Sequence, residues 1–337
     1  MIKDETLQAG MEEGLRFACV LNGKGGCCDL DWKGVAEWTP ERGFLWIHLE
    51  RDSPVASCWI REKSGVEPLV ADALLEDVSR PTIESFDQAM LLVLRGVNIA
   101  EGAAERRETE LVPIHVWIDG ARAITLRDKH HALSALRDIR IALKAGRGPR
   151  RPGTLLAQIC DKIVRDVGPA VEEMDEEVER LEDAVMETAS KELRRRLADL
   201  RRRAVHLRRY LGPQREALIN LQTADTPLLE KPDRLRLRCV IDSVIRYLED
   251  MDALRDRTTI LHEDLAAQIS EQIAHTSNRL TSVAALLLPP SLVAGMLGMN
   301  VAGIPGQSSD FAFWELAAIM VVLMAVQAAV LRWIHWL

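Results

Sequence analysis

Apolar residues form two long runs near the C-terminal end of the chain. Residues 280–309 contain no Asp, Glu, Lys, Arg or His, and the apolar part of this segment, Leu280 to Met299, has about the 20 residues that a membrane-spanning helix needs. A second run begins at Phe311 and carries one charge, Glu315, before Arg332. The pattern predicts two transmembrane helices, about 280–299 and 311–334, joined by an outer loop over 300–310.

The basic residues around these two runs predict their orientation. The loop between them contains no Lys or Arg, whereas Arg279 precedes the first run and Arg332 follows the second. Because basic residues flank transmembrane helices on the cytoplasmic side, both termini are expected in the cytoplasm. The first residues of the chain lack the apolar segment of a signal peptide, so the body that precedes the runs is expected to stay in the cytosol.

Residues 1–150 alternate between short β-like runs and helical spacing. Asp119-Gly120 separates the last two β-like runs and is a hairpin signal. Apolar spacing between Ser53 and Val78, interrupted near Gly65 and Pro68, predicts helices that pack on the sheet. The fold class expected for this part is an α/β cytosolic domain. Its expected strands are Phe17 to Leu21, Phe44 to Leu49, Met90 to Val97, Leu111 to Ile118 and Ala121 to Leu126.

The Gly- and Pro-rich segment 146–153 ends this domain, and residues 151–232 are expected to form an antiparallel helical hairpin. Its first helix, Thr154 to about Thr188, carries nine acids after Val171, and the next carries nine bases between Lys191 and Arg209. A short turn around Ser190 makes the two helices antiparallel neighbours, so that acidic side chains face basic ones. Exposed ion pairs contribute little energy, so they fix the register of the two helices more than they stabilise the fold. The basic run is therefore interpreted as pairing within the chain rather than as an RNA-binding surface.

From about Asp233 no helix breaker occurs before Pro289-Pro290, so one helix can run from the cytosol into the membrane over 233–299. At about 1.5 Å per residue it spans roughly 100 Å. Every seventh residue along it is acidic or small, and a second series four residues on is mostly small. A strict seven-residue repeat keeps one face inward when helices supercoil, and acids and hydroxyls favour a water-filled centre over a coiled-coil seam. The first series is Glu249, Asp256, Glu263, Ser270, Ser277, Ala284, Ser291 and Gly298, and the second is Ala253, Ile260, Ala267, Ala274, Thr281, Leu288 and Gly295.

These series define an inward stripe with two parts. We expect its funnel acids to attract cations and its membrane part to line a pore that Leu288, the bulkiest member there, narrows. The funnel acids are Glu249, Asp256 and Glu263; the pore-lining residues are Ser270, Ser277, Thr281, Ala284, Leu288, Ser291 and Gly295.

Composition narrows the functional classes. The 51 acids against 43 bases give a net charge of −8, which argues against a nucleic-acid partner and suits a body that attracts cations. The glycine turn Asn22 to Gly26 lacks the Gly-Lys-Ser/Thr of a phosphate loop, and no nucleophile or metal triad stands out, so an enzyme is not expected. The pair Cys27-Cys28 is interpreted as an ordinary loop pair rather than a soft-metal sensor, because neighbouring side chains of an extended backbone point apart. A membrane-tethered sensor or enzyme stays open as an alternative class.

The tripeptide Gly298-Met299-Asn300 stands between the two apolar runs. Two spans joined by Gly-Met-Asn at the outer mouth resemble the CorA superfamily of divalent-cation transporters, and the run Leu297 to Gly306 is similar to its zinc-transporting ZntB branch. The segments Phe44 to Leu49 and Arg80 to Glu84 are similar to the cytosolic domain of that family, in which the second leads into a central strand. The resemblance implies a homopentameric funnel in the lipid bilayer of the bacterial inner membrane, with zinc as transported ion, proton coupling, and no cofactor.

The outer mouth is expected to handle the ion with its water shell. Gly298 leaves space where backbones crowd, and five copies of Asn300 would form a polar ring that contacts a hydrated ion through water. Asp310 and Glu315 either recruit ions or are an ordinary loop acid and helix-start acid. Zinc prefers Cys and His ligands, and neither residue occurs between Asn278 and Ile334. The residues alone therefore do not decide whether the transported ion is zinc or instead magnesium or cobalt.

Overall fold

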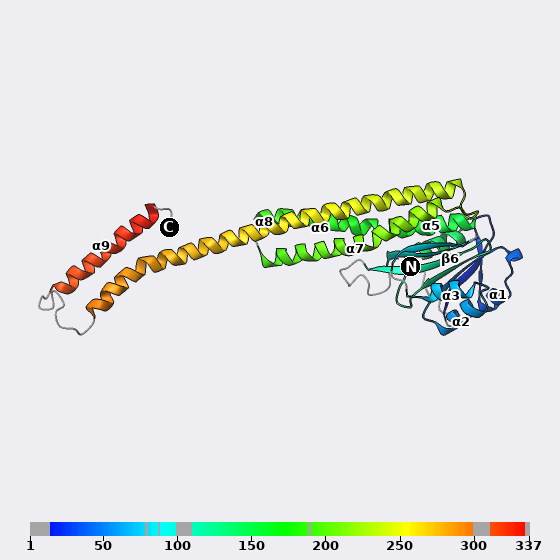
Figure 1. Cartoon of the computed structure of the whole chain (residues 1–337), viewed down its shortest axis with the longest axis horizontal. Coiled ribbons are helices and arrows are strands. Elements are labelled where there is room, and N and C mark those ends of the chain that lie inside the picture. Colours follow the sequence, from blue (N-terminus) through cyan, green and yellow to red (C-terminus); the bar gives the residue numbers. More distant parts are fainter. Residues whose placement is uncertain are drawn as a thin grey trace. The chain divides into compact units, whose positions relative to one another are not determined.

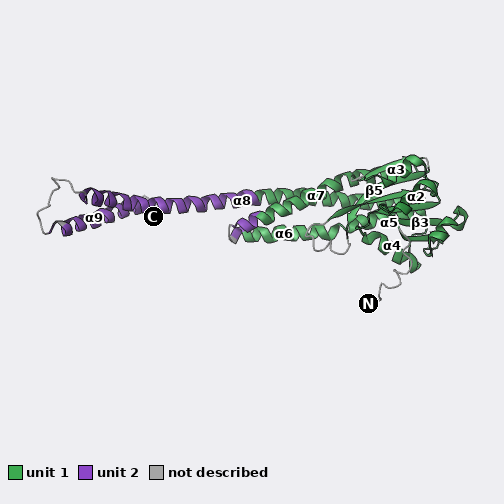
Figure 2. Ribbon diagram, turned by 90° about the horizontal axis from the view of Figure 1, so that it is seen from below, with its two compact units in different colours: residues 1–184, 195–260 green, residues 185–194, 261–337 purple. Residues whose placement is uncertain are grey.

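The computed structural model describes residues 14–77, 80–86, 88–98, 110–187, 190–298 and 311–333. The chain divides into two compact units, one made of residues 1–184 with 195–260 and the other of residues 185–194 with 261–337 (Figure 2). The first unit contains the sheet and most of the helices, and the second contains the C-terminal part of the longest helix together with the last helix (Figure 1).

A seven-stranded mixed sheet forms the centre of the first unit, in the order β2-β1-β3-β7-β6-β5-β4. Neighbouring strands are antiparallel except β3 and β7, which run parallel with Leu45 opposite Arg122. The strands are β1 (Leu15–Leu21), β2 (Cys27–Leu30), β3 (Phe44–Glu50), β4 (Thr82–Phe86), β5 (Ala89–Val97), β6 (Leu111–Ile118) and β7 (Arg122–Arg127).

Both faces of this sheet are covered, which explains why β3 and β5 are nearly continuous apolar runs. Alternate residues of the strands form one buried cluster with α1 (Trp32–Ala36), α2 (Pro54–Glu62) and α3 (Pro68–Leu75). On the opposite face α5 (Pro152–Arg165) packs against β5 and against α4 (Ser134–Lys144). The predicted α/β domain with helices on the sheet is therefore confirmed.

All five predicted strands are present, and the Asp119-Gly120 hairpin joins β6 to β7. Two strands were not predicted. β2 places Cys27 and Cys28 on a strand, so their interpretation as a loop pair was wrong. The Asn22 side chain accepts hydrogen bonds from the main-chain N–H groups of Lys24 and Gly26 and closes the turn between β1 and β2. β4 is the second unpredicted strand.

The segment Arg80 to Glu84 does not lead into a central strand. Its last residues belong to β4, which lies at the edge of the sheet, and β4 leads to β5, the second strand from that edge. The reason lies in its composition, because Thr82–Phe86 has few apolar residues and is mostly exposed, as an edge strand can be.

The acidic helix begins later than its sequence pattern predicts. Instead of one helix from Thr154 to Thr188 the structure has α5 and then α6 (Gly168–Glu187), separated at Asp166 and Val167. Pro169 explains the break, because proline has no N–H to donate to the carbonyl of Arg165, the last residue of α5, and is tolerated in the first turn of a new helix. The basic helix is α7 (Lys191–Thr223), followed by α8 (Lys231–Leu297) and α9 (Ala312–Trp333).

The predicted long helix is confirmed. α8 has 67 residues and continues through Pro289 and Pro290 without interruption, and α8 and α9 are the two described helices that are long and apolar enough to cross a membrane.

Candidate ion-conduction path

Two opposite faces of α8 have different environments in the first unit. Leu237, Val244 and Met251, spaced by seven, are fully buried there. We call these three residues the buried seam. Members of the inward stripe come two or five positions after a seam residue, which places the stripe on the far side of the helix. Glu249, Ala253 and the other described members of the stripe up to Ile260 are exposed. The stripe is thus the face of α8 that the rest of its own unit leaves uncovered.

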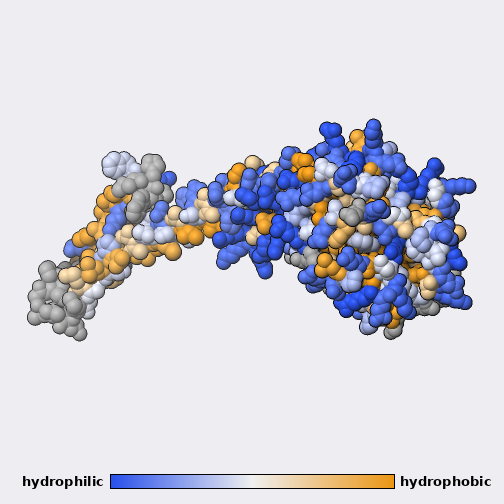
Figure 3. Space-filling model, turned by 45° about the vertical axis from the view of Figure 1, so that its right-hand side comes forward, coloured by the Kyte–Doolittle hydropathy of each residue, from blue (hydrophilic) through white to orange (hydrophobic). Residues whose placement is uncertain are grey.

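The same division returns in the apolar part of α8 in the second unit, after residues 270–281, which are exposed on every side. Every residue that we expect to line the pore, from Ser270 to Gly295, is exposed, including Leu288 with 67% of its surface accessible. Ser282 and Pro290 are buried on the other side of α8, and the partly covered residues of α9 recur every three or four positions, as on one face of a helix. Apolar side chains dominate the visible surface of α9 and of the last turns of α8 (Figure 3).

The funnel acids lie on the exposed part of the stripe. The Asp256 carboxylate lies 3.7 Å from Nε of its neighbour Arg255, and Glu249 and Glu263 are exposed. Partial burial raises the pKa of Asp250, and the negative charges of Asp175 and Glu249 raise it further. The carboxylates of Asp175 and Glu249 thus lie near enough to Asp250 to act on its charge, although burial is the larger cause.

Ion pairs between helices hold α8 in place beside α6 and α7. Arg257 on α8 binds both carboxylate oxygens of Glu182 on α6, at 2.9 and 2.7 Å, and reaches Asp175 at 3.0 Å. Arg203 on α7 lies 3.3 Å from Glu173 and 3.5 Å from Glu177 on α6. The predicted pairing of acidic α6 with basic α7 is confirmed, and α8 takes part in it, which the sequence pattern did not indicate.

The outer motif is described only at its first residue. Gly298 still donates its N–H to the carbonyl of Ala294 at 2.9 Å, and a Cβ at this position would lie 3.2 Å from that oxygen. Met299, Asn300, the loop 300–310 and Asp310 lie outside the described residues. Glu315 is exposed in the first turn of α9, where a carboxylate is favourable.

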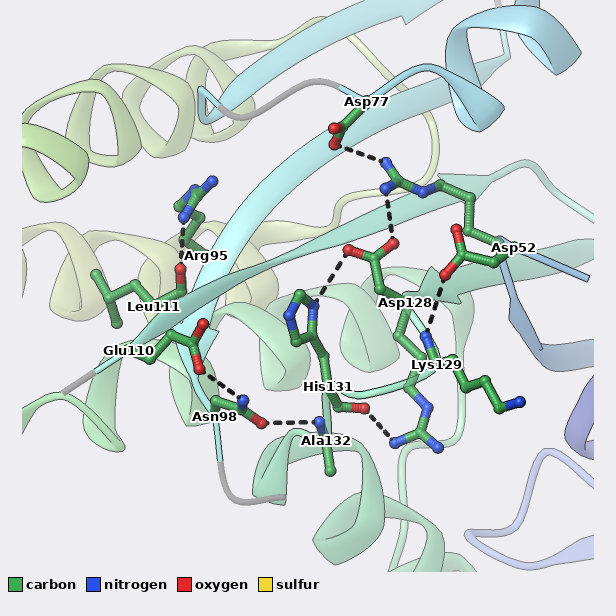
Figure 4. Close-up of polar contacts among 12 residues, drawn as sticks. Asp52, Asp77, Arg95, Asn98, Glu110, Leu111, Asp128, Lys129, His131 and Ala132 are labelled. Atoms are coloured by element: carbon green, nitrogen blue, oxygen red, sulfur yellow. Dashed lines mark hydrogen bonds and ion pairs between the residues drawn. The ribbon is translucent and has the colours of Figure 1, made fainter. Parts of the chain in front are cut away.

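A second polar cluster lies at the carboxyl ends of the parallel strands β3 and β7 (Figure 4). The guanidinium of Arg51 joins Asp77 at 3.1 Å and Asp128 at 2.7 Å, and His131 Nδ1 lies 3.2 Å from the Asp128 carboxylate. Asp77 and Asp128 thus share Arg51 as a basic partner, which makes this part of the cluster an ion-pair network. Among the residues that the structure describes, no group of three His, Cys, Asp or Glu side chains could hold a metal ion.

One polar residue of α9 was not singled out from the sequence, although its signal was present. Gln327 is the single polar residue between Glu315 and Arg332, and its side-chain oxygen is buried without a hydrogen-bond partner among the described residues. Buried polar groups within a membrane span are costly and usually have a role.

Comparison with known proteins adds to this geometry. The family model of the CorA-like Mg²⁺ transporter protein matches residues 41–332. The chain is 31% identical to the divalent cation transporter CmaX of Pseudomonas aeruginosa over 351 residues, 99% of this chain and 100% of that protein. It is 28% identical to the zinc transport protein ZntB of Pectobacterium carotovorum over 324 residues, 96% of each chain.

Two solved structures share the fold over nearly the whole length. The structure of full-length CmaX matches with a TM-score of 0.82 and 29% identity, over 98% of this chain and 100% of that one. The CorA magnesium transporter from Methanocaldococcus jannaschii matches with a TM-score of 0.77 and 19% identity, over 94% and 96% of the two chains, and shows the fold alone.

Proposed function

Since the chain belongs to the CorA family of divalent-cation transporters, we propose that it carries zinc across the bacterial inner membrane as a homopentamer with both termini in the cytoplasm. In this proposal residues 1–150 form the cytosolic domain, 151–232 the helical hairpin, and 233–299 the stalk that continues as the first span. The outer loop covers 300–310 and the second span 311–334.

The observation that carries the proposal is the uncovered stripe of α8. Its small and polar residues are exposed along both units, on the side opposite to the buried seam. Hydroxyl groups within an apolar span favour water over lipid. Several copies of α8 that face one axis would give these groups a water-filled centre, and a ring of five is the assembly that the resemblance to the family implies.

The ion would meet three regions in turn. The Asn300 carboxamides would contact its water shell at the outer mouth, with Asp310 and Glu315 as nearby acids. Between Gly295 and Ser270 the small side chains would leave room for a hydrated ion, and the funnel acids would lower its energy on the cytosolic side.

The zinc assignment rests on similarity to the ZntB branch and is tested by ion flux. The purified protein is reconstituted into liposomes that contain an ion-sensitive dye. The initial rates of Zn²⁺, Mg²⁺ and Co²⁺ uptake are compared with and without a pH gradient. Zinc uptake that exceeds the others and rises with an inward proton gradient is the expected result. Faster uptake of magnesium than of zinc would make magnesium the transported ion. Equal zinc uptake with and without the pH gradient would exclude proton coupling.

A magnesium or cobalt channel is the second candidate. It is favoured by the absence of Cys and His from the sequence between Asn278 and Ile334, because hard cations need oxygen ligands and zinc sites commonly use nitrogen and sulfur.

Replacement of Asn300 tests the outer motif. Asn300→Ala should abolish or severely lower uptake without preventing assembly, because it deletes a polar ring and leaves helix packing untouched. Assembly is measured by light scattering on the purified oligomer. Near-normal uptake by a correctly assembled Asn300→Ala protein would exclude the motif from the mechanism.

A further inference from the structure

Two consecutive prolines lie inside the apolar part of α8. Pro289 and Pro290 have no main-chain N–H, yet the helix continues to Leu297. The carbonyl of Leu286 would normally accept from the N–H of residue 290, or from that of residue 289 in a tighter turn. Both donors are absent, so proline chemistry leaves the Leu286 carbonyl without a regular helical partner.

Such a carbonyl needs another donor when it lies at membrane depth, because hydrocarbon offers no water for it. It also lies on the covered side of α8. Pro290 is buried and Leu286 and Pro289 are half-buried, whereas Thr281, Leu288 and the rest of the stripe are exposed. The missing donor is therefore expected from the helix that covers this side, and not from the stripe.

Between Glu315 and Arg332, α9 carries one polar side chain that can supply it. Gln327 is half-buried on the partly covered face of α9, and its Oε1 is buried without a hydrogen-bond partner among the described residues. A half-turn about the last side-chain bond exchanges Oε1 with Nε2, which carries two N–H donors. The same buried position can thus hold a donor instead of an acceptor.

The two groups lie at matching depths. α8 ends and α9 begins at the same end of the second unit (Figures 1 and 2). Leu286 lies about 17 Å from the end of α8 and Gln327 about 22 Å from the start of α9, at about 1.5 Å per residue. The covered positions of the two helices give the register. Counted from the shared end, they include Leu297, Val293, Pro290 and Leu286 on α8 and Leu316, Met320, Met324 and Gln327 on α9, so Gln327 comes opposite Leu286.

We propose that Gln327 is a positioning residue that donates a hydrogen bond to the main-chain carbonyl of Leu286, left unpaired by Pro289 and Pro290, and so fixes the pore helix at its proline pair. The pair lies next to Leu288 of the stripe, so this bond sets how that side chain faces the conduction path. The inference rests on the proposed function for its transport readout but not for its assembly and stability readouts.

The test compares Gln327→Leu with wild type in the liposome assay. The maximal initial rate should fall roughly three- to tenfold, as expected for one intramembrane hydrogen bond, while the half-saturating ion concentration stays unchanged because the outer motif is intact. Val326→Leu, at an exposed position of the same helix, is the matched control and should behave as wild type.

A compensating change separates this role from general packing. Pro290→Ala returns a main-chain N–H to the Leu286 carbonyl, so adding Gln327→Leu to Pro290→Ala should lower the rate less than twofold. An equal loss from Gln327→Leu in both backgrounds would overturn the proposal.

If Gln327→Leu does not assemble, recovery of the oligomer by Pro290→Ala supports the proposal and failure to recover it overturns the proposal. If wild type carries no ion, the proposed function fails, but this inference is still tested by the thermal unfolding midpoints of wild type, Gln327→Leu, Pro290→Ala and the double variant. Gln327→Leu should then lower the midpoint less in the Pro290→Ala background than in wild type, and an equal loss in both would overturn the proposal.

Discussion

The contact of Arg257 with α6 allows a quantitative prediction. Its guanidinium makes two hydrogen bonds to Glu182 and one to Asp175, and about a third of the Arg257 and Glu182 side chains is exposed. Exposed ion pairs contribute about 0.2–1 kcal/mol each, and the bidentate geometry places this pair toward the upper end, so after allowance for solvent screening Arg257→Gln should cost about 1–2 kcal/mol. At about 2–4 °C per kcal/mol, the unfolding midpoint should fall by about 2–8 °C.

The assay is thermal unfolding of the purified full chain, followed by tryptophan fluorescence at several pH values. Arg255→Gln is the control, because the Arg255 guanidinium lies 3.7 Å from the carboxylate of the adjacent Asp256 and both side chains are exposed. The hydrogen bond from Arg257 lowers the pKa of Glu182 below its usual 4.5, so the stabilisation is complete above that value and is lost as the pH falls through the lowered pKa. Equal losses from the two substitutions at neutral pH, or a difference that persists in strong acid, would refute the reasoning.

Two further predictions concern the pore and the packing of glycines. Leu288→Ser should leave a wetter pore with higher basal ion leak in liposomes, because five leucines can narrow a pore enough to exclude water, whereas Leu287→Ser should mainly lower the yield of assembled protein; the reverse pattern would mean that the stripe is shifted by one residue. Gly153→Ala should lower stability by about 1–3 kcal/mol, because its Cβ would lie 2.1 Å from a main-chain carbonyl, whereas Gly212→Ala, where no atom lies within 4 Å, should raise the unfolding midpoint slightly. A midpoint that changes equally in both glycine variants would show that the close contact relaxes at no cost.

The sequence was sufficient for elements whose pattern is long and strong. The strands around Trp46 and Leu92 are apolar on both faces because helices cover both sides of the sheet, and this produces the runs that predicted them. The length of α8 followed from the lack of helix breakers, and the hairpin at Asp119 followed from turn chemistry.

Other features depend on contacts that a single sequence does not reveal. β2 and β4 are short and partly exposed, so local composition carries little signal for them. The parallel pairing of β3 with β7 joins residues more than seventy positions apart. The stripe of α8 was predicted from its spacing, but the proposal for Gln327 required knowing which side of α8 is covered.

The parallel pairing of β3 with β7 has a consequence for biosynthesis. β3 is synthesised about seventy residues before the strand that pairs with its second edge. At a synthesis rate of about 5–20 residues per second, that edge waits roughly 4–14 s on the ribosome for β7. During this interval the unpaired N–H and C=O groups along that edge are a target for wrong pairing, and chaperone binding to β3 itself would protect them.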